Sequence, residues 1–142
     1  MGGIITRSLG LDIGDKRIGV ALSDPESILA SPLTIIDRGD EGQGIEAIVG
    51  VINQYQVRQI VVGLPRSMDG SIGKQAEKVE AFVQKLCRHT EVPVKFRDER
   101  LTTVSAKRLM QDASTKKTRR KARDDAVAAA LILQGYLDET RS

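Results

Sequence analysis

The stretch 9-LGLDIGDKRIGVAL-22 contains two short apolar runs separated by the polar turn Gly14–Arg17. Short apolar runs on either side of turn residues predict a β-hairpin inside a packed sheet. Asp12 lies in the middle of the first run, where an ionised carboxylate loses hydration and needs a cation or several donors instead. Gly10 and Gly14 lie two residues to either side on the same face, and we expect them to leave that face open to a bulky group. The hairpin therefore predicts a strand that presents Asp12 to a metal ion.

The rest of the chain alternates strand and helix patterns. A strand at 31–36 is expected at a sheet edge because Pro32 cannot donate a ladder hydrogen bond, and the apolar run Gln59–Pro65 is typical of a buried parallel strand. Helical spacing and turn signals predict the remaining elements: a loop at 38–44, helices at 45–55, 76–86, 102–110 and 122–137, a fifth strand at 93–97 and a loop at 112–121.

This order predicts an α/β fold. We expect a mixed five-stranded sheet whose first three strands are antiparallel, flanked by helices on both faces. With 142 residues and no internal repeat, the chain is expected to form one domain over residues 1–142.

The composition excludes several classes of site. Cys87 and His89 are the only cysteine and histidine, so the chain has no intramolecular disulfide, no zinc cluster of these residues and no histidine-based metal site. Aromatic residues make up 3% of the chain, too few for a base-stacking platform. No apolar run approaches the ~20 residues of a membrane span. We therefore expect a cytoplasmic protein without a membrane partner.

Positive charge is concentrated in the second half of the chain. The net charge is +3, but residues 72–142 carry sixteen Lys and Arg against ten Asp and Glu. Six of the eight residues from Lys116 to Arg123 are cationic, which is a natural electrostatic footprint for a phosphate backbone. The simpler alternative is a solvated loop that confers solubility. We favour contact with nucleic acid because acidic residues follow the block directly.

Three acidic positions could meet in the predicted fold. Asp12 lies on the first strand, Asp98 and Glu99 end the fifth, and Asp125 opens the last helix on the face that must pack against the sheet. Its neighbour Asp124 is rotated about 100° away on the helix, towards solvent.

Carboxylates that converge without histidine or cysteine form a hard-oxygen site suited to Mg²⁺ or Mn²⁺. Two such ions about 3.5–4 Å apart can activate a water and stabilise the leaving oxygen of a phosphodiester. Simpler roles compete for two of the acids: Glu99 could pair with Arg97 or Arg100, and Asp125 could cap its helix.

Four motifs extend this interpretation over nearly the whole chain. They are 11-LDIGDKRIGVA-21, 61-VVGLP-65 with 68-MDG-70, 98-DERLTT-103 and 125-DAVAAALILQ-134. In this order they resemble the YqgF/RuvX family of pre-16S rRNA nucleases, also described as Holliday-junction-resolvase-like proteins. The resemblance implies an RNase H-like fold and a metal-dependent nuclease that hydrolyses phosphodiester bonds at the 5′ end of precursor 16S rRNA during ribosome biogenesis.

The resemblance also assigns roles to residues. The acidic positions of the family fall on three residues that would bind the metal and carry out catalysis: Asp12, Glu99 and Asp125. Asp124 stands where the family usually has an apolar residue, but the buried helix face favours Asp125. The cations expected to hold phosphates are Lys16, Arg17, Arg100, Lys116, Lys117, Arg119, Arg120, Lys121 and Arg123.

Two other functions remain open at this point. The first is a resolvase of four-way DNA junctions, because basic residues that contact phosphates do not distinguish ribose from deoxyribose. The second is a non-catalytic RNA-binding factor of ribosome assembly. An actin-like ATPase is rejected because it needs two such domains and the chain has room for one. We expect a monomer or weak homodimer whose partner is precursor rRNA or branched DNA.

Overall fold

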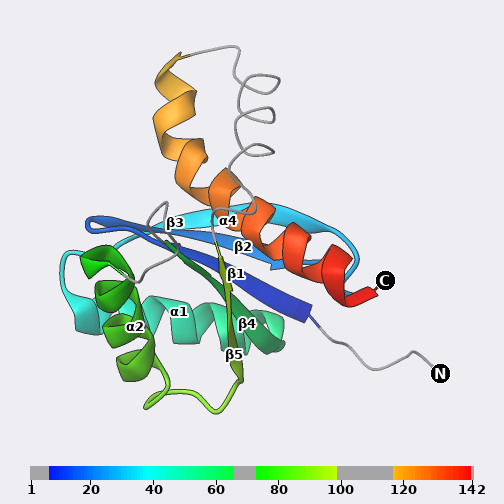
Figure 1. Ribbon diagram of the computed structural model, residues 1–142, viewed down its shortest axis with the longest axis horizontal. Coiled ribbons are helices and arrows are strands. Elements are labelled where there is room, and N and C mark those ends of the chain that lie inside the picture. The colour runs from blue at the N-terminus through cyan, green and yellow to red at the C-terminus, as the bar shows by residue number, and fades with distance from the viewer. Residues whose placement is uncertain (1–6, 66–72, 99–116, 142) are drawn as a thin grey trace.

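The computed structural model describes residues 7–65, 73–98 and 117–141 (Figure 1). Within α4, side chains are described from Ala126 to Thr140. The elements are β1 (Arg7–Ile13), β2 (Arg17–Ser23), β3 (Ala30–Asp37), α1 (Glu41–Tyr55), β4 (Val57–Leu64), α2 (Lys74–Leu86), β5 (Val94–Asp98) and α4 (Lys117–Arg141).

The five strands form one mixed sheet in the order β3-β2-β1-β4-β5. β1 pairs antiparallel with β2, and β2 with β3, whereas β4 lies parallel to both β1 and β5. The predicted sheet is confirmed, including the antiparallel first three strands and the edge position of β3, and β1 lies at its centre. The register of β2 and β3 shifts between Val20 and Ala21, next to the Ala21–Pro32 pair, where the proline cannot donate to the ladder.

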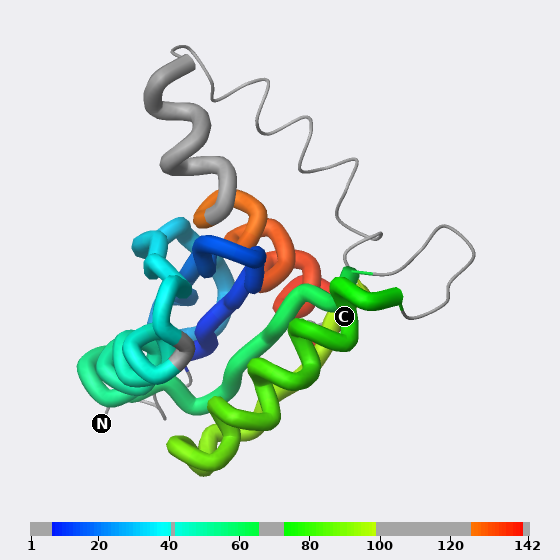
Figure 2. The backbone as a smooth tube through the Cα atoms, turned by 90° about the vertical axis from the view of Figure 1, so that its left-hand side faces the viewer, coloured from blue at the N-terminus to red at the C-terminus, as the bar shows by residue number. Residues whose placement is uncertain are grey.

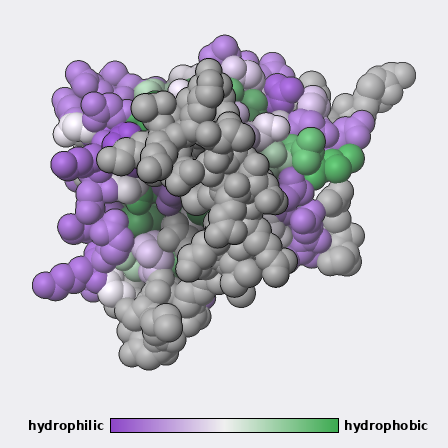
Figure 3. Space-filling view, turned by 90° about the horizontal axis from the view of Figure 1, so that it is seen from above, coloured by the Kyte–Doolittle hydropathy of each residue, from purple (hydrophilic) through white to green (hydrophobic). Residues whose placement is uncertain are grey.

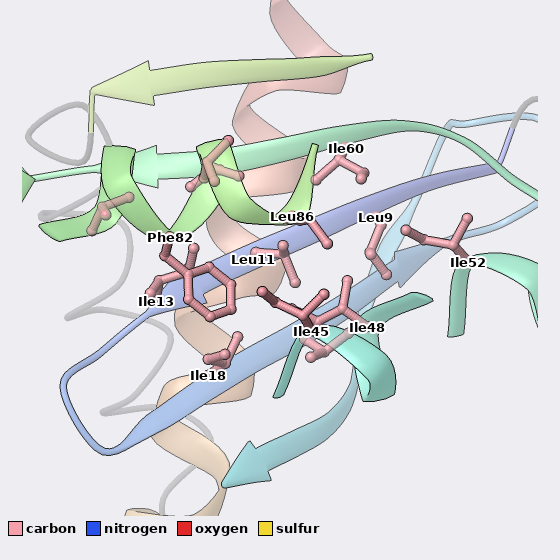
Figure 4. Close-up of a cluster of buried hydrophobic side chains, with 14 of the residues drawn as sticks. Leu9, Leu11, Ile13, Ile18, Ile45, Ile48, Ile52, Ile60, Phe82 and Leu86 are labelled. Carbon is pink, nitrogen blue, oxygen red and sulfur yellow. The ribbon is translucent and has the colours of Figure 1, made fainter. Parts of the chain in front are cut away.

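Helices cover both faces of the sheet, as predicted (Figures 1 and 2). α1 and α2 lie on one face, where branched aliphatic side chains of the central strands meet those of the helices. Figure 4 shows this cluster around Leu11, Ile48 and Phe82, each at most 1% exposed. Full burial of such side chains contributes about 1.5–3 kcal/mol each to folding.

α4 packs on the opposite face with smaller side chains. The buried cluster there contains Ala21 and Val61 from the sheet, and Ala129, Ala130, Ile132, Leu133 and Leu137 from the helix. Small residues allow the helix backbone to approach the strands closely.

In two places a helix starts inside a segment predicted to be a loop. α1 starts at Glu41, so the loop predicted at 38–44 is wrong from there on. Asp40 is the N-cap: its side chain accepts a hydrogen bond from Gly42 N at 3.0 Å and satisfies an otherwise unpaired donor of the first turn.

α4 starts at Lys117, so the loop predicted at 112–121 is wrong over its last five residues, and the helix also continues past Leu137 to Arg141. The reason lies in intrinsic propensity, since Lys, Arg and Ala are good helix formers. The helix predicted at 102–110 lies outside the described residues. In the part of the chain that the structure describes, no helix is both long and apolar enough to cross a membrane.

Candidate active site

Asp12 projects from the face of β1 that α4 covers. Side chains alternate along a strand, and Leu11 and Ile13 belong to the core beneath α1 and α2. Asp12 and Gly10 therefore face the other way, towards α4. The Asp12 side chain is half-buried there.

Glycines flank Asp12 on both neighbouring strands. Gly19 of β2 is its direct partner. On the other side, Leu11 pairs with Val62 of β4, which makes the next residue, Gly63, the neighbour of Asp12. Since neither position carries a side chain, the carboxylate is not crowded from either strand. Sequence analysis missed this pair, because it appears only when the strand register is known.

Gly10 and Gly14, the glycines predicted to leave space beside Asp12, have other structural roles. A Cβ atom on Gly10 would lie 2.7 Å from the carbonyl oxygen of Ala129 and 2.8 Å from Leu133 Cβ. Gly14 belongs to the hairpin turn: its N–H donates to Arg17 O at 2.9 Å, and a Cβ there would also lie 2.9 Å from that oxygen. The expectation that both leave the face bare is wrong, because α4 fills the space over the first and the second closes the turn.

The direction of α4 follows from its contacts further along. The side chain of Gln134 accepts a hydrogen bond from Ala30 N at 2.8 Å. Ala30 pairs with Ser23, whose hydroxyl accepts from Ser8 N near the start of β1. α4 therefore runs towards the beginning of β1, and its earlier turns lie towards the end that carries Asp12 (Figure 1).

This direction brings the backbone at position 125 towards Asp12. Asp125 precedes Ala129 by one helical turn, about 6 Å at 1.5 Å per residue. Asp12 follows Gly10 by two strand residues, about 7 Å. Since Ala129 lies over Gly10, the two steps match in direction and length. The side chains of Asp124 and Asp125 are not described, so the metal-binding role of Asp125 and the solvent-facing position of Asp124 stay predictions.

The third predicted acid, Glu99, follows the last residue of β5 in sequence. Asp98 is the last residue of the strand and pairs with Leu64. Arg97 packs against α4 at Gly135, so Asp98 projects to the opposite face. Glu99 and Arg100 lie outside the described residues. Among the side chains that are described, no group of three or more His, Cys, Asp or Glu could hold a metal, and the metal site stays a prediction.

Two of the cations predicted to bind phosphate lie at the β1–β2 turn. Lys16 and Arg17 are exposed and line a shallow groove of about 490 Å³, together with Asp15, Ile35, Asp37 and Gly39. Arg38 fixes this turn: its N–H donates to Lys16 O at 2.9 Å, and its Nη1 donates to Gly14 O at 2.8 Å. Its guanidinium also stacks on Phe82, 4.9 Å from the ring centroid. The basic groups thus stand on a turn anchored to the core.

The basic block lies at the start of α4. Lys117, Arg119, Arg120, Lys121 and Arg123 fall within its first two turns, and Figure 1 shows these turns extending beyond the sheet. Lys116 lies outside the described residues. The described surface is largely hydrophilic when seen from above (Figure 3). Over all the described residues, the exposed large apolar side chains are Ile28, Leu29 and Phe96.

Comparison with known proteins identifies relatives over nearly the full length. A sequence model of the RuvX family, described as Holliday junction resolvase, matches residues 6–139. A "Putative pre-16S rRNA nuclease" of Roseiflexus sp. (strain RS-1) is 50% identical over 95% of this chain and 96% of its own. A protein of the same name from Dehalococcoides mccartyi is 51% identical over 90% of this chain and 95% of its own.

Solved structures with low identity share the fold. RuvC of Thermus thermophilus, in complex with a Holliday junction substrate, superimposes with a TM-score of 0.64 at 14% identity, covering 96% of this chain and 97% of its own. The fowlpox virus resolvase, in complex with Holliday junction DNA, gives a TM-score of 0.61 at 13% identity, covering 96% and 100%. At such identities the likeness concerns the fold alone, and it confirms the RNase H-like architecture.

The relatives and the family model confirm the family recognised from the four motifs, and they confirm the prediction of a phosphodiester-cleaving nuclease. The chain belongs to the RuvX family of nucleases.

Proposed function

We propose that this protein is a metal-dependent nuclease that hydrolyses a phosphodiester bond in 5′-end maturation of 16S rRNA, in the cytoplasm. The observation that carries the proposal is the position of Asp12: half-buried on the central strand, flanked by Gly19 and Gly63, at the point that α4 approaches with position 125. Relatives that share about half of their residues with this chain bear the corresponding name.

Asp12, Glu99 and Asp125 would hold Mg²⁺ or Mn²⁺. The residue types fit such ions, because carboxylate oxygens are the ligands that hard divalent cations prefer. The bound metal would supply an activated water and charge stabilisation for the leaving oxygen. Asp12 supplies a carboxylate from the rigid centre of the sheet, where the neighbouring glycines leave space for a phosphate group beside it. We leave Asp98 out of this proposal, because strand alternation puts its side chain on the face opposite that of Arg97.

Lys16 and Arg17 would hold the nucleic-acid backbone beside the metal, together with Arg100 and the basic block at 116–123. The anchored turn gives the first two a fixed position, at the end of the strand that carries Asp12. Binding should weaken as salt rises, with a slope of log K against log salt near −0.7 per neutralised phosphate on a single strand. An affinity that does not change between low and high salt would exclude these cations as the contact surface.

The decisive experiment compares two substrates. Purified protein is incubated with Mg²⁺ or Mn²⁺ on a 5′-extended 16S rRNA precursor and on a synthetic four-way DNA junction, with Asp12→Asn in parallel to reveal contaminating activity. The proposal expects cleavage of the precursor that requires the metal and that is absent in the variant. Cleavage of the precursor by both proteins, or by neither, would contradict it.

The second candidate is a junction resolvase, favoured by the description of the matching family. Symmetric cleavage of a junction needs two active sites related by a twofold axis. Metal-dependent cutting of the junction by a dimer, with the precursor left intact, would select this function. A strictly monomeric protein in solution would exclude it.

The third candidate is a non-catalytic RNA-binding assembly factor with an acidic cluster that holds no metal. In that case this protein would bind the precursor without cleaving it, and adding Mg²⁺ would not raise its melting temperature. The nuclease proposal expects a gain, because a ligand that binds only the folded state stabilises it.

A further inference from the structure

Arg97 is a buried cation between β5 and α4. Its side chain is 9% exposed, and its Nη2 donates to Glu139 Oε1 at 2.8 Å. The guanidinium lies directly on the helix backbone at Gly135, where an added Cβ would lie 2.6 Å from Cζ and 2.7 Å from Nη2. Only a residue without a side chain at position 135 leaves space for this arrangement.

Hydrogen bonding alone does not account for the burial of Arg97. Its Nε and Nη1 are buried and have no hydrogen-bond partner in the described part of the structure. The side chain of its ionic partner, Glu139, is 54% exposed, and ion pairs with such access to water contribute little to stability. Because buried, unpaired donors cost free energy, packing between strand and helix must hold the guanidinium where it is.

The location of this contact connects it to the proposed active site. Arg97 pairs with Gly63, the glycine beside Asp12, and it faces the same side of the sheet. In sequence it stands two residues before Glu99, and it is the second-last residue of β5. Gly135 and Glu139 belong to the helix that brings position 125 towards β1.

The contact therefore joins the end of β5 to α4 across the glycine at position 63. If the Arg97 guanidinium moves relative to Gly135, the distance between β5 and α4 changes. Such a shift would alter the fit of a metal held between them and β1.

From this geometry we propose that Arg97, seated on Gly135 and paired with Glu139, is a positioning residue that sets the distance between β5 and α4 and thereby the affinity of the site for its divalent metal. The proposal rests on the proposed nuclease function. Arg97 touches neither metal nor substrate in this role.

The test measures the Mg²⁺ concentration at half-maximal cleavage and the melting temperature of each protein. Arg97→Lys keeps the charge but loses the flat group that fills the space over Gly135. Gly135→Ala leaves Arg97 intact and displaces its guanidinium. We expect both variants to raise the half-maximal Mg²⁺ concentration by about 10- to 100-fold, the range for residues that orient metal ligands.

Glu139→Gln should have the smallest effect, because the glutamate is partly exposed. Arg58→Lys, an exposed arginine of β4, serves as the matched control and should behave as the wild type.

A purely structural role would lower the melting temperature and leave the half-maximal Mg²⁺ concentration unchanged. That result in both Arg97→Lys and Gly135→Ala overturns the proposal. If Arg97→Lys does not fold, Gly135→Ala alone decides by the same criterion. A wild-type protein that shows no metal-dependent cleavage contradicts the proposed function and this inference with it. If the wild type shows metal-dependent cleavage and the variants have the same half-maximal Mg²⁺ concentration, the inference about Arg97 is contradicted and the proposed function is not.

Discussion

The two faces of the sheet are built in opposite ways. Beneath α1 and α2, branched and aromatic side chains such as Leu11, Ile18 and Phe82 fill a continuous apolar core. Beneath α4, the strands contribute glycines and small residues, and the polar side chains of Asp12 and Arg97 lie among them.

The difference shows how one small sheet can combine stability with chemistry. Burial of large apolar side chains on one face supplies the free energy of folding. The other face can then carry a half-buried carboxylate and a buried guanidinium, both of which cost free energy. The face with the weaker apolar packing is the one on which the proposed active site lies.

Adjacent residues of β1 give the sharpest test of this division. Asp12→Asn should lower the rate of precursor cleavage by about 10³-fold, the scale of removing one charge that stabilises a transition state. That loss corresponds to about 4 kcal/mol of activation free energy. The melting temperature without metal should stay near that of the wild type.

Asp15→Asn is the matched control, since Asp15 is an exposed carboxylate three residues further along whose described partner is Lys78 at 3.8 Å. Its cleavage rate should be within a few-fold of the wild type. Equal losses in both variants would mean that the position of Asp12 on the α4 face has no special role.

Leu11→Ala should have the opposite phenotype. Leu11 is fully buried in the core beneath α1 and α2, and truncation of such a leucine costs about 3 kcal/mol of unfolding free energy. The rate per folded molecule should change little, because the proposed active site lies on the other face. Denaturant unfolding and a cleavage assay well below the midpoint measure the two quantities separately. A full loss of activity in a protein that remains folded would show that the faces are not independent.

Gly10→Ala probes the close contact that joins α4 to β1. The new methyl group would lie less than 3.0 Å from the Ala129 carbonyl oxygen and from Leu133 Cβ, so the helix must shift. Overpacking of this kind costs about 2 kcal/mol. Because the shift also moves position 125 relative to Asp12, cleavage should need more Mg²⁺. Gly50→Ala, inside α1 with nothing within 4 Å of the new Cβ, is the control: it should leave the Mg²⁺ requirement unchanged and raise stability by up to about 1 kcal/mol, because alanine favours helix over glycine.

The core face was predictable from sequence, and the face under α4 only in part. Helical spacing and the continuous run at 59–65 fixed the strands and helices beneath α1 and α2, because periodic apolar residues report burial directly. Asp12 stood out as an isolated charge in an apolar strand. Its glycine neighbours did not, since Gly19 and Gly63 become its neighbours only through strand register. The contact between Arg97 and Gly135 depends on helix docking, for which a single sequence carries no signal.

The start of α4 was missed for a different reason. The charge of this run of cations predicts a loop, whereas the helix propensity of Lys, Arg and Ala predicts a helix. Repulsion between exposed cations is screened by water and salt, so it does not prevent a helix that is anchored further along by packing. Charge pattern and backbone preference were two separate signals, and the second predicted the structure.

Polar contacts near the C-terminal end of α4 give the test with the smallest expected effect. Gln134 holds the β2–β3 loop through Ala30 N and the carbonyl oxygen of Ile28. The same loop is closed by Asp24, whose Oδ1 accepts from Leu29 N at 2.9 Å and Ile28 N at 2.7 Å. The Leu29 N–H, with a smaller contribution from Ile28, lowers the pKa of Asp24 against the opposing effect of partial burial.

A carboxyl group with a lowered pKa in the folded state stabilises the protein above its unfolded pKa of about 3.9, and this contribution is lost as the pH falls through the folded pKa. Asp24→Asn keeps an acceptor but removes the charge. We expect it to cost about 0.5 kcal/mol at neutral pH, discounted for screening near the surface. The cost should shrink as the pH falls below about 3.9 and vanish once the pH has passed through the lowered pKa of Asp24, where the wild type is protonated as well. Melting temperatures of both proteins across this range measure the difference, and a constant gap at all pH values would show that the Asp24 charge does not stabilise the loop on which α4 rests.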